Sequence, residues 1–133
     1  MAPEDPLVNA MLLCEHVHAD TASGKHTLLG VFDEVRISRF PVDLATFAVY
    51  LNLTNLRGTY EVDLLWLRGD TEEELARLGP IGGIEVVDPL SRVELVLLGQ
   101  DLAFPVPGRY VLRLAMNRRH LQDYVIIATE SPE

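Results

Sequence analysis

The sequence predicts an all-β protein, a single-domain antiparallel β-sandwich of seven to eight strands. Two observations lead to this prediction. Apolar residues recur at every second position over most of the chain, and short segments rich in Gly, Pro, Asn and Asp separate these runs. A period of two places alternate side chains on one face of a strand, and many short strands joined by turns are typical of sandwiches.

The clearest strands are the runs ATFAVYLNLTNL and TYEVDLLWLRG, which flank Arg57 and Gly58. They predict an antiparallel hairpin with a shared apolar face. The same alternation predicts the other strands, with turns in DTASGK, RFPVD, PVPG and NRR. In chain order, we expect strands over residues 9–19, 25–38, 45–55, 59–68, 92–102, 109–117 and 121–129.

Residues 70–91 follow the alternating pattern less closely. TEEELARLG is either a short strand or a helical turn, because acidic residues after Asp70 and Thr71 favour a helix N-terminus. IEVVD predicts a short strand, which would be the eighth. Neither alternative changes the fold class.

The length of 133 residues predicts one domain over residues 1–133, with an ordered core over about 8–129. The net charge is −9, and Arg118-Arg119 is the one basic pair that stands out. Because phosphates and anionic lipids attract basic surfaces, we expect neither nucleic acid nor a membrane as partner.

The chain has one cysteine, which cannot form an internal disulfide, and acidic residues stand near its start where a signal peptide carries basic ones. We therefore expect a cytoplasmic protein.

The run FPVPGRYVLRLAMN begins a late strand with Pro-Gly-x-Tyr. It resembles the tyrosine corner of immunoglobulin-like Greek-key sandwiches, in which a tyrosine bonds to backbone just upstream. The resemblance implies that the Tyr110 hydroxyl bonds to backbone near residues 101–106. In the alternative, Tyr110 is only the first core residue after a turn.

Three stretches together, MLLCEHVHAD, GKHTLLGVFDEVRISRFP and FPVPGRY, carry a family likeness from about Ala10 to Thr129. The chain resembles a family of small bacterial β-sandwich proteins known only as a domain of unknown function. The resemblance implies a fold and no activity, cofactor or catalytic residue. It also implies scaffold roles for Cys14, Gly30, Phe32, Asp33 and Pro41.

The stretch CEHVHAD gathers a thiol, two imidazoles and two carboxylates. On a strand, His16 and His18 project from one face, and His26 follows a tight turn, so three imidazoles could converge on a metal. A fourth ligand is not evident. Cys14 lies about 6–7 Å from His16 by strand geometry, too far for a nucleophile and its base. We therefore favour a solvent-facing strand end, and predict no cofactor and no catalytic residue.

The outer face of the sheets is unusually apolar. Alternation places Leu65 and Leu67 on the face of strand 59–68 opposite the core set, and Val96 and Leu98 on that of strand 92–102. Either residues 70–91 cover this face, or it is an interface, because monomers rarely expose a large apolar patch.

These observations favour a non-enzymatic protein–protein interaction or accessory module, a homodimer in which Leu65, Leu67, Val96 and Leu98 lie side by side. The alternative is a small metal-binding protein or metal-dependent enzyme centred on His16, His18 and His26. The sequence leaves open whether a small ligand binds between the sheets.

Overall fold

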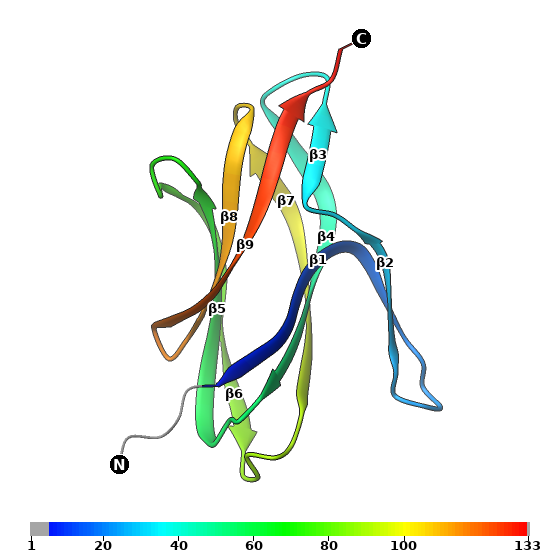
Figure 1. Ribbon diagram of the computed structural model, residues 1–133, viewed down its shortest axis with the longest axis vertical. Coiled ribbons are helices and arrows are strands. Elements are labelled where there is room, and N and C mark those ends of the chain that lie inside the picture. Colours follow the sequence, from blue (N-terminus) through cyan, green and yellow to red (C-terminus); the bar gives the residue numbers. More distant parts are fainter. Residues whose placement is uncertain (1–5, 133) are drawn as a thin grey trace.

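The computed structural model describes residues 6–132, which form nine β-strands in two sheets (Figure 1). No helix in this part of the chain is long and apolar enough to cross a membrane. The strands are β1 (Leu7–Ala19), β2 (His26–Val31), β3 (Glu34–Ile37), β4 (Val42–Thr54), β5 (Gly58–Arg68), β6 (Glu74–Val86), β7 (Val93–Phe104), β8 (Gly108–Met116) and β9 (Arg119–Glu130).

The two sheets pack face to face as a Greek-key sandwich. Sheet A has the order β2-β1-β4-β7, and sheet B has the order β3-β9-β8-β5-β6. All pairs are antiparallel except β3 with β9, which is parallel. The predicted fold class is therefore confirmed, with nine strands in place of seven or eight.

The predicted hairpin at Arg57-Gly58 is wrong, because β4 and β5 lie in different sheets. The buried side chain of Leu56 and the backbone bond from Asn55 N to Pro89 O hold the connection as it crosses between them. The two runs do share an apolar core, but they face each other across it. Alternation gives the same pattern for strands that pair and for strands that face each other.

The strand predicted over 25–38 is two strands, and the chain changes sheet between β2 and β3. Phe32 N donates to Leu13 O in sheet A at 3.0 Å, whereas Asp33 O accepts from Ile127 N in sheet B at 2.9 Å. Gly30 precedes this crossing with a φ of +69°, and a Cβ there would lie 2.8 Å from the Glu15 side chain. Both features explain the scaffold roles expected of Gly30, Phe32 and Asp33.

Residues 70–91 form no helix, and they do not fold over the outer face of the sheets. They contain β6, a 13-residue strand that pairs with β5 and is an edge of sheet B. Its alternation is obscured because Gly79, Pro80, Gly82 and Gly83 interrupt it, and its register with β5 shifts three times.

An aromatic cluster closes one end of the core. The rings of Trp66 and Tyr110 stack with centroids 5.3 Å apart, and Phe104 meets both edge-on. The buried Tyr110 hydroxyl donates to Val106 O at 2.5 Å and accepts from Val106 N at 3.2 Å. This confirms the bond to upstream backbone at the corner where the chain passes from sheet A to sheet B.

Candidate interaction surface

β7 presents a free backbone edge. Its residues Val93–Gln100 pair with β4 in unbroken register, from Leu53 opposite Val93 to Thr46 opposite Gln100. No strand in residues 6–132 pairs with the other side of β7. The regular stretch ends at Asp101, whose φ is +58°. An unpaired strand edge offers a row of N–H and C=O groups to another strand.

The remaining edges are poorer templates for a further strand. β6 carries Pro80 and three register shifts, which are devices that protect sheet edges. β2 and β3 have only six and four residues. Of the four edge strands that the structure describes, β2, β3, β6 and β7, β7 is therefore the one that is both long and regular.

Two apolar side chains accompany this edge on the outer face of sheet A. Leu98 is 71% exposed, and Val96 is half-buried. Their β4 neighbours, Ala48 opposite Leu98 and Tyr50 opposite Val96, are buried. On this side of the sheet the open apolar surface thus lies on the edge strand and not on β4, whereas Leu29 and Val31 are exposed on β2 at the opposite edge.

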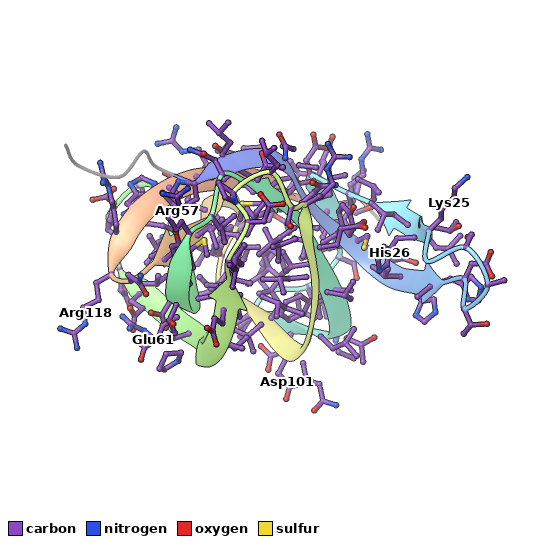
Figure 2. All side chains as sticks on the ribbon, turned by 90° about the horizontal axis from the view of Figure 1, so that it is seen from below. Lys25, His26, Arg57, Glu61, Asp101 and Arg118 are labelled. Carbon is purple, nitrogen blue, oxygen red and sulfur yellow. The ribbon has the colours of Figure 1, made fainter. Side chains whose placement is uncertain are left out.

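The β1–β2 hairpin contributes to covering this face beside β4. It turns out of the sandwich (Figure 1), and Figure 2 shows Lys25 and His26 on it. The His26 ring lies 5.5 Å from the Tyr50 ring, and its Nδ1 lies 2.9 Å from Oε2 of Glu94 on β7. The Tyr50 hydroxyl donates to the same Glu94 oxygen. A polar cluster thus joins the hairpin to the edge strand.

The electrostatics of this cluster follow from its hydrogen bonds. The Tyr50 hydroxyl holds the pKa of the Glu94 carboxyl below its ordinary value, and His26 and Arg92 act in the same direction. Burial, and then the bond to Glu94, raise the pKa of Tyr50. Glu94 is therefore ionised at neutral pH and bound toward Tyr50.

The four residues predicted as one interface do not lie side by side, because β5 is in sheet B and β7 is in sheet A. Leu65 lies opposite Arg77 and Arg113, and Leu67 is only 4% exposed. Long arginine side chains commonly cover apolar neighbours in this way. Val96 and Leu98 are the two predicted interface residues on the open β7 edge.

Charged residues bridge the outer face of sheet B. Arg113 bonds to both carboxylate oxygens of Asp123 and to Glu72, and His120 Nε2 lies 2.8 Å from Asp123. Burial raises the pKa of Asp123, but the hydrogen bonds and charges of Arg113 and His120 together outweigh burial and hold that pKa low. This face is therefore bridged by ion pairs around Asp123.

The three histidines proposed as a metal site have separate surroundings. His16 and His18 are exposed on β1, whereas His26 bonds to Glu94. No group of three or more His, Cys, Asp or Glu side chains within residues 6–132 is arranged to hold a metal ion. The structure thus provides no support for the metal-centred alternative.

Cys14 packs as a buried residue of sheet A. Its thiol is fully buried and lies 3.6 Å from Ala48 O. Burial raises the pKa of the Cys14 thiol, which disfavours the nucleophilic thiolate.

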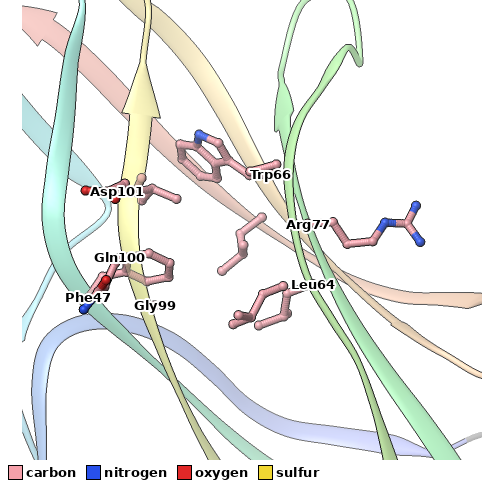
Figure 3. Close-up of a pocket in the computed structure, with 11 residues that line it drawn as sticks. Phe47, Leu64, Trp66, Arg77, Gly99, Gln100 and Asp101 are labelled. Carbon is pink, nitrogen blue, oxygen red and sulfur yellow. The ribbon is translucent and has the colours of Figure 1, made fainter.

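A small cleft lies between β6 and β7 (Figure 3). Leu64 and Trp66 point into it, whereas the Arg77 guanidinium points away. Its volume of 80 Å³ is well below the roughly 300–1,000 Å³ of typical ligand pockets. We therefore place the candidate site on the β7 edge and not in this cleft.

Sequence reasoning found Val96 and Leu98 but missed Glu94 and the free edge itself. A signal for the edge was present. The stretch VELVLLG has high β-propensity and a single charge, and it lacks the proline and lysine that protect edge strands. Nothing in the sequence says that this strand has a neighbour on one side only.

The fold and this surface define a small immunoglobulin-like β-sandwich with a long, regular open edge at β7. The chain belongs to a family of unknown function, DUF6941, whose model matches residues 9–129. This confirms the expected likeness to an uncharacterised family. No curated protein matches the chain. A crystal structure of an immunoglobulin-like protein from Pseudomonas aeruginosa is similar, with 14% identity, a TM-score of 0.45, and coverage of 96% of this chain and 99% of that one.

Proposed function

We propose that the chain is a non-enzymatic association module of the cytoplasm, which binds a protein partner by adding a strand to the β7 edge. The observation that carries this proposal is the regular stretch Val93–Gln100, which is unpaired on one side and includes the exposed side chain of Leu98. In strand addition, main-chain hydrogen bonds supply affinity and alternate side chains supply specificity. β7 offers both unpaired main-chain groups and alternate side chains, Val96 and Leu98, on its outer face.

A tethered strand tests whether the edge accepts a partner. A copy of residues 91–102 is fused to the C-terminus of the full chain through a Gly/Ser linker of about 20 residues, which spans about 25 Å on average. Tethering raises the local concentration of the strand to the millimolar range. Weak binding therefore becomes measurable within one molecule.

The readout is amide hydrogen exchange along residues 93–100. We expect the β7 amides that point away from β4 to exchange at least about 10-fold more slowly in the fusion, because strand addition gives them hydrogen-bond acceptors. The control fusion carries the same twelve residues in scrambled order, with one proline added at the centre. Equal exchange in the two fusions would show that the edge does not accept a strand, and the proposed function would be wrong.

A further inference from the structure

We propose that the partner of the β7 edge is β7 of a second copy of this chain, paired antiparallel about a two-fold axis at Leu97. This inference rests on the proposed function and names its partner. The result is a continuous eight-stranded sheet made of two copies of sheet A. Closed two-fold contacts are the commonest in soluble oligomers because one surface serves both partners.

The side chains of β7 select this register. An axis at Leu97 places Val96 of each copy opposite Leu98 of the other, so that four apolar side chains form one cluster on the outer face. It also places Glu94 opposite Gln100 of the other copy, with no like charges opposed. Directly opposed residues in a sheet interact most strongly, so each of these pairs contributes.

Neighbouring registers are less favourable. An axis at Val96 places Leu98 opposite Glu94 of the other copy, and an axis at Leu98 places Val96 opposite Gln100. Each of these arrangements opposes an apolar side chain to a polar one. Backbone pairing does not choose among them, because either type of antiparallel pair can lie on a two-fold axis.

Charges at the ends of the pairing stretch are compatible with this register and disfavour an axis at Leu98, which would place Arg92 opposite Phe104 of the other copy. With the axis at Leu97, exposed Arg92 of each copy lies within one position of exposed Asp101 of the other. This arrangement pairs opposite charges twice. The contact is small, since only one edge strand from each copy is involved, so we expect a dimer in the micromolar range.

Disulfide trapping tests the register. Val96→Cys and Leu98→Cys variants are mixed under mild oxidation, and Cys14 is retained because it is fully buried. Opposed residues have Cβ atoms about 4.5–5.5 Å apart, close to the separation that a disulfide requires. We expect the mixed disulfide to exceed either homodimer at least about 5-fold, because the like residues lie diagonally and farther apart. A predominance of either homodimer overturns the register.

Light scattering tests the partner. Leu98→Glu should raise the dimer dissociation constant at least about 100-fold, because both copies lose a buried leucine. Leu29→Glu is the matched control, since Leu29 is 50% exposed on β2 at the opposite edge of the same sheet. This control should leave the dissociation constant unchanged.

The two proposals fail in different ways. A wild-type chain that stays monomeric at all concentrations overturns self-pairing, and so does a dimer that Leu98→Glu leaves intact. If the tethered strand still protects β7 in either case, the proposed function stands with a different partner. If the tethered strand gives no protection, both proposals are overturned.

Discussion

Tyr110 shows how one hydroxyl fixes the corner between the sheets. It bonds to both backbone groups of Val106 while its ring stacks on Trp66. We expect Tyr110→Phe to lower the free energy of unfolding by about 1 kcal/mol, because a buried hydrogen bond is lost. Urea unfolding measures this change.

Tyr60 provides the comparison, because its hydroxyl bonds to the N and O of Arg57 in an exposed loop. Water can replace those bonds, so Tyr60→Phe should have the smaller effect. Equal losses for the two variants would contradict a special role for the corner.

Glu94 links the hairpin to the edge strand, and its protonation reports this link. We expect Tyr50→Phe to raise the pKa of the Glu94 carboxyl, because the Tyr50 bond is the main cause that lowers it. A side-chain carbon NMR titration of Glu94 measures the shift. Tyr60→Phe, which removes a hydroxyl elsewhere, should leave this pKa where it is.

The lowered pKa of Glu94 also determines how the stability of the fold depends on pH. The pKa of Glu94 is lower in the folded than in the unfolded state, so its stabilising contribution is present above the unfolded pKa of about 4.3. That contribution is lost as the pH falls through the folded pKa. Stability should therefore fall less steeply with acid in Tyr50→Phe than in the wild type.

At the scale of elements, β7 lies close to β4 at Gly99. A Cβ on Gly99 would lie 2.2 Å from Cζ of the buried Phe47 ring. We expect Gly99→Ala to cost about 1–3 kcal/mol in thermal or urea unfolding, because the ring must move within a packed core.

Gly82 on β6 is the control, because a Cβ there would meet nothing closer than 3.9 Å. Gly82→Ala should be neutral or stabilise by up to about 1 kcal/mol, since alanine restricts the unfolded chain. If Gly99→Ala were equally harmless, the close contact between β7 and Phe47 would be disproved.

The outer faces of the two sheets should respond differently to a new charge. Leu67 on β5 is 4% exposed and Leu98 on β7 is 71% exposed. We expect Leu67→Glu to destabilise the fold by about 3 kcal/mol, because it replaces a buried leucine with a polar side chain that must lose its water. Leu98→Glu should change monomer stability by no more than about 0.5 kcal/mol. Chemical unfolding of dilute samples measures both, and similar losses would contradict the difference between the faces.

At the scale of the molecule, the topology predicts slow folding. Central strands of sheet A pair residues far apart in sequence, such as Cys14 with Ala48 and Val49 with Leu97. Domains dominated by such pairings fold in milliseconds to seconds, because chain entropy is lost before the contacts form. Stopped-flow fluorescence of Trp66, the single tryptophan, measures the rate. Folding in microseconds would contradict this expectation.

The sequence was informative where structure is local. Alternation gave the approximate extent of most strands, and Pro-Gly-x-Tyr gave the corner, because both depend on residues close together in the chain. It did not find β6 as one strand, because Gly79, Pro80 and Gly83 interrupt its pattern. The strand predicted over 25–38 hid a change of sheet, because an extended chain keeps its alternation when its pairing partner changes.

The four residues predicted as one interface are divided between the two sheets. Val96 and Leu98 do border the open edge, whereas Leu65 and Leu67 lie on the other sheet. Period two tells which residues of a strand share a face, but not which sheet the strand joins. Glu94 and His26 meet only in the folded chain, because they lie 68 positions apart in the sequence.

The sequence by itself therefore determined the fold class, the family likeness and the inward or outward side of most strand residues, because these depend on local pattern. Only the tertiary structure decided that β7 is an edge, that β6 lies beside β5, and that Tyr50 binds Glu94. These facts depend on long-range pairing, in which many arrangements satisfy the same alternation and packing selects one.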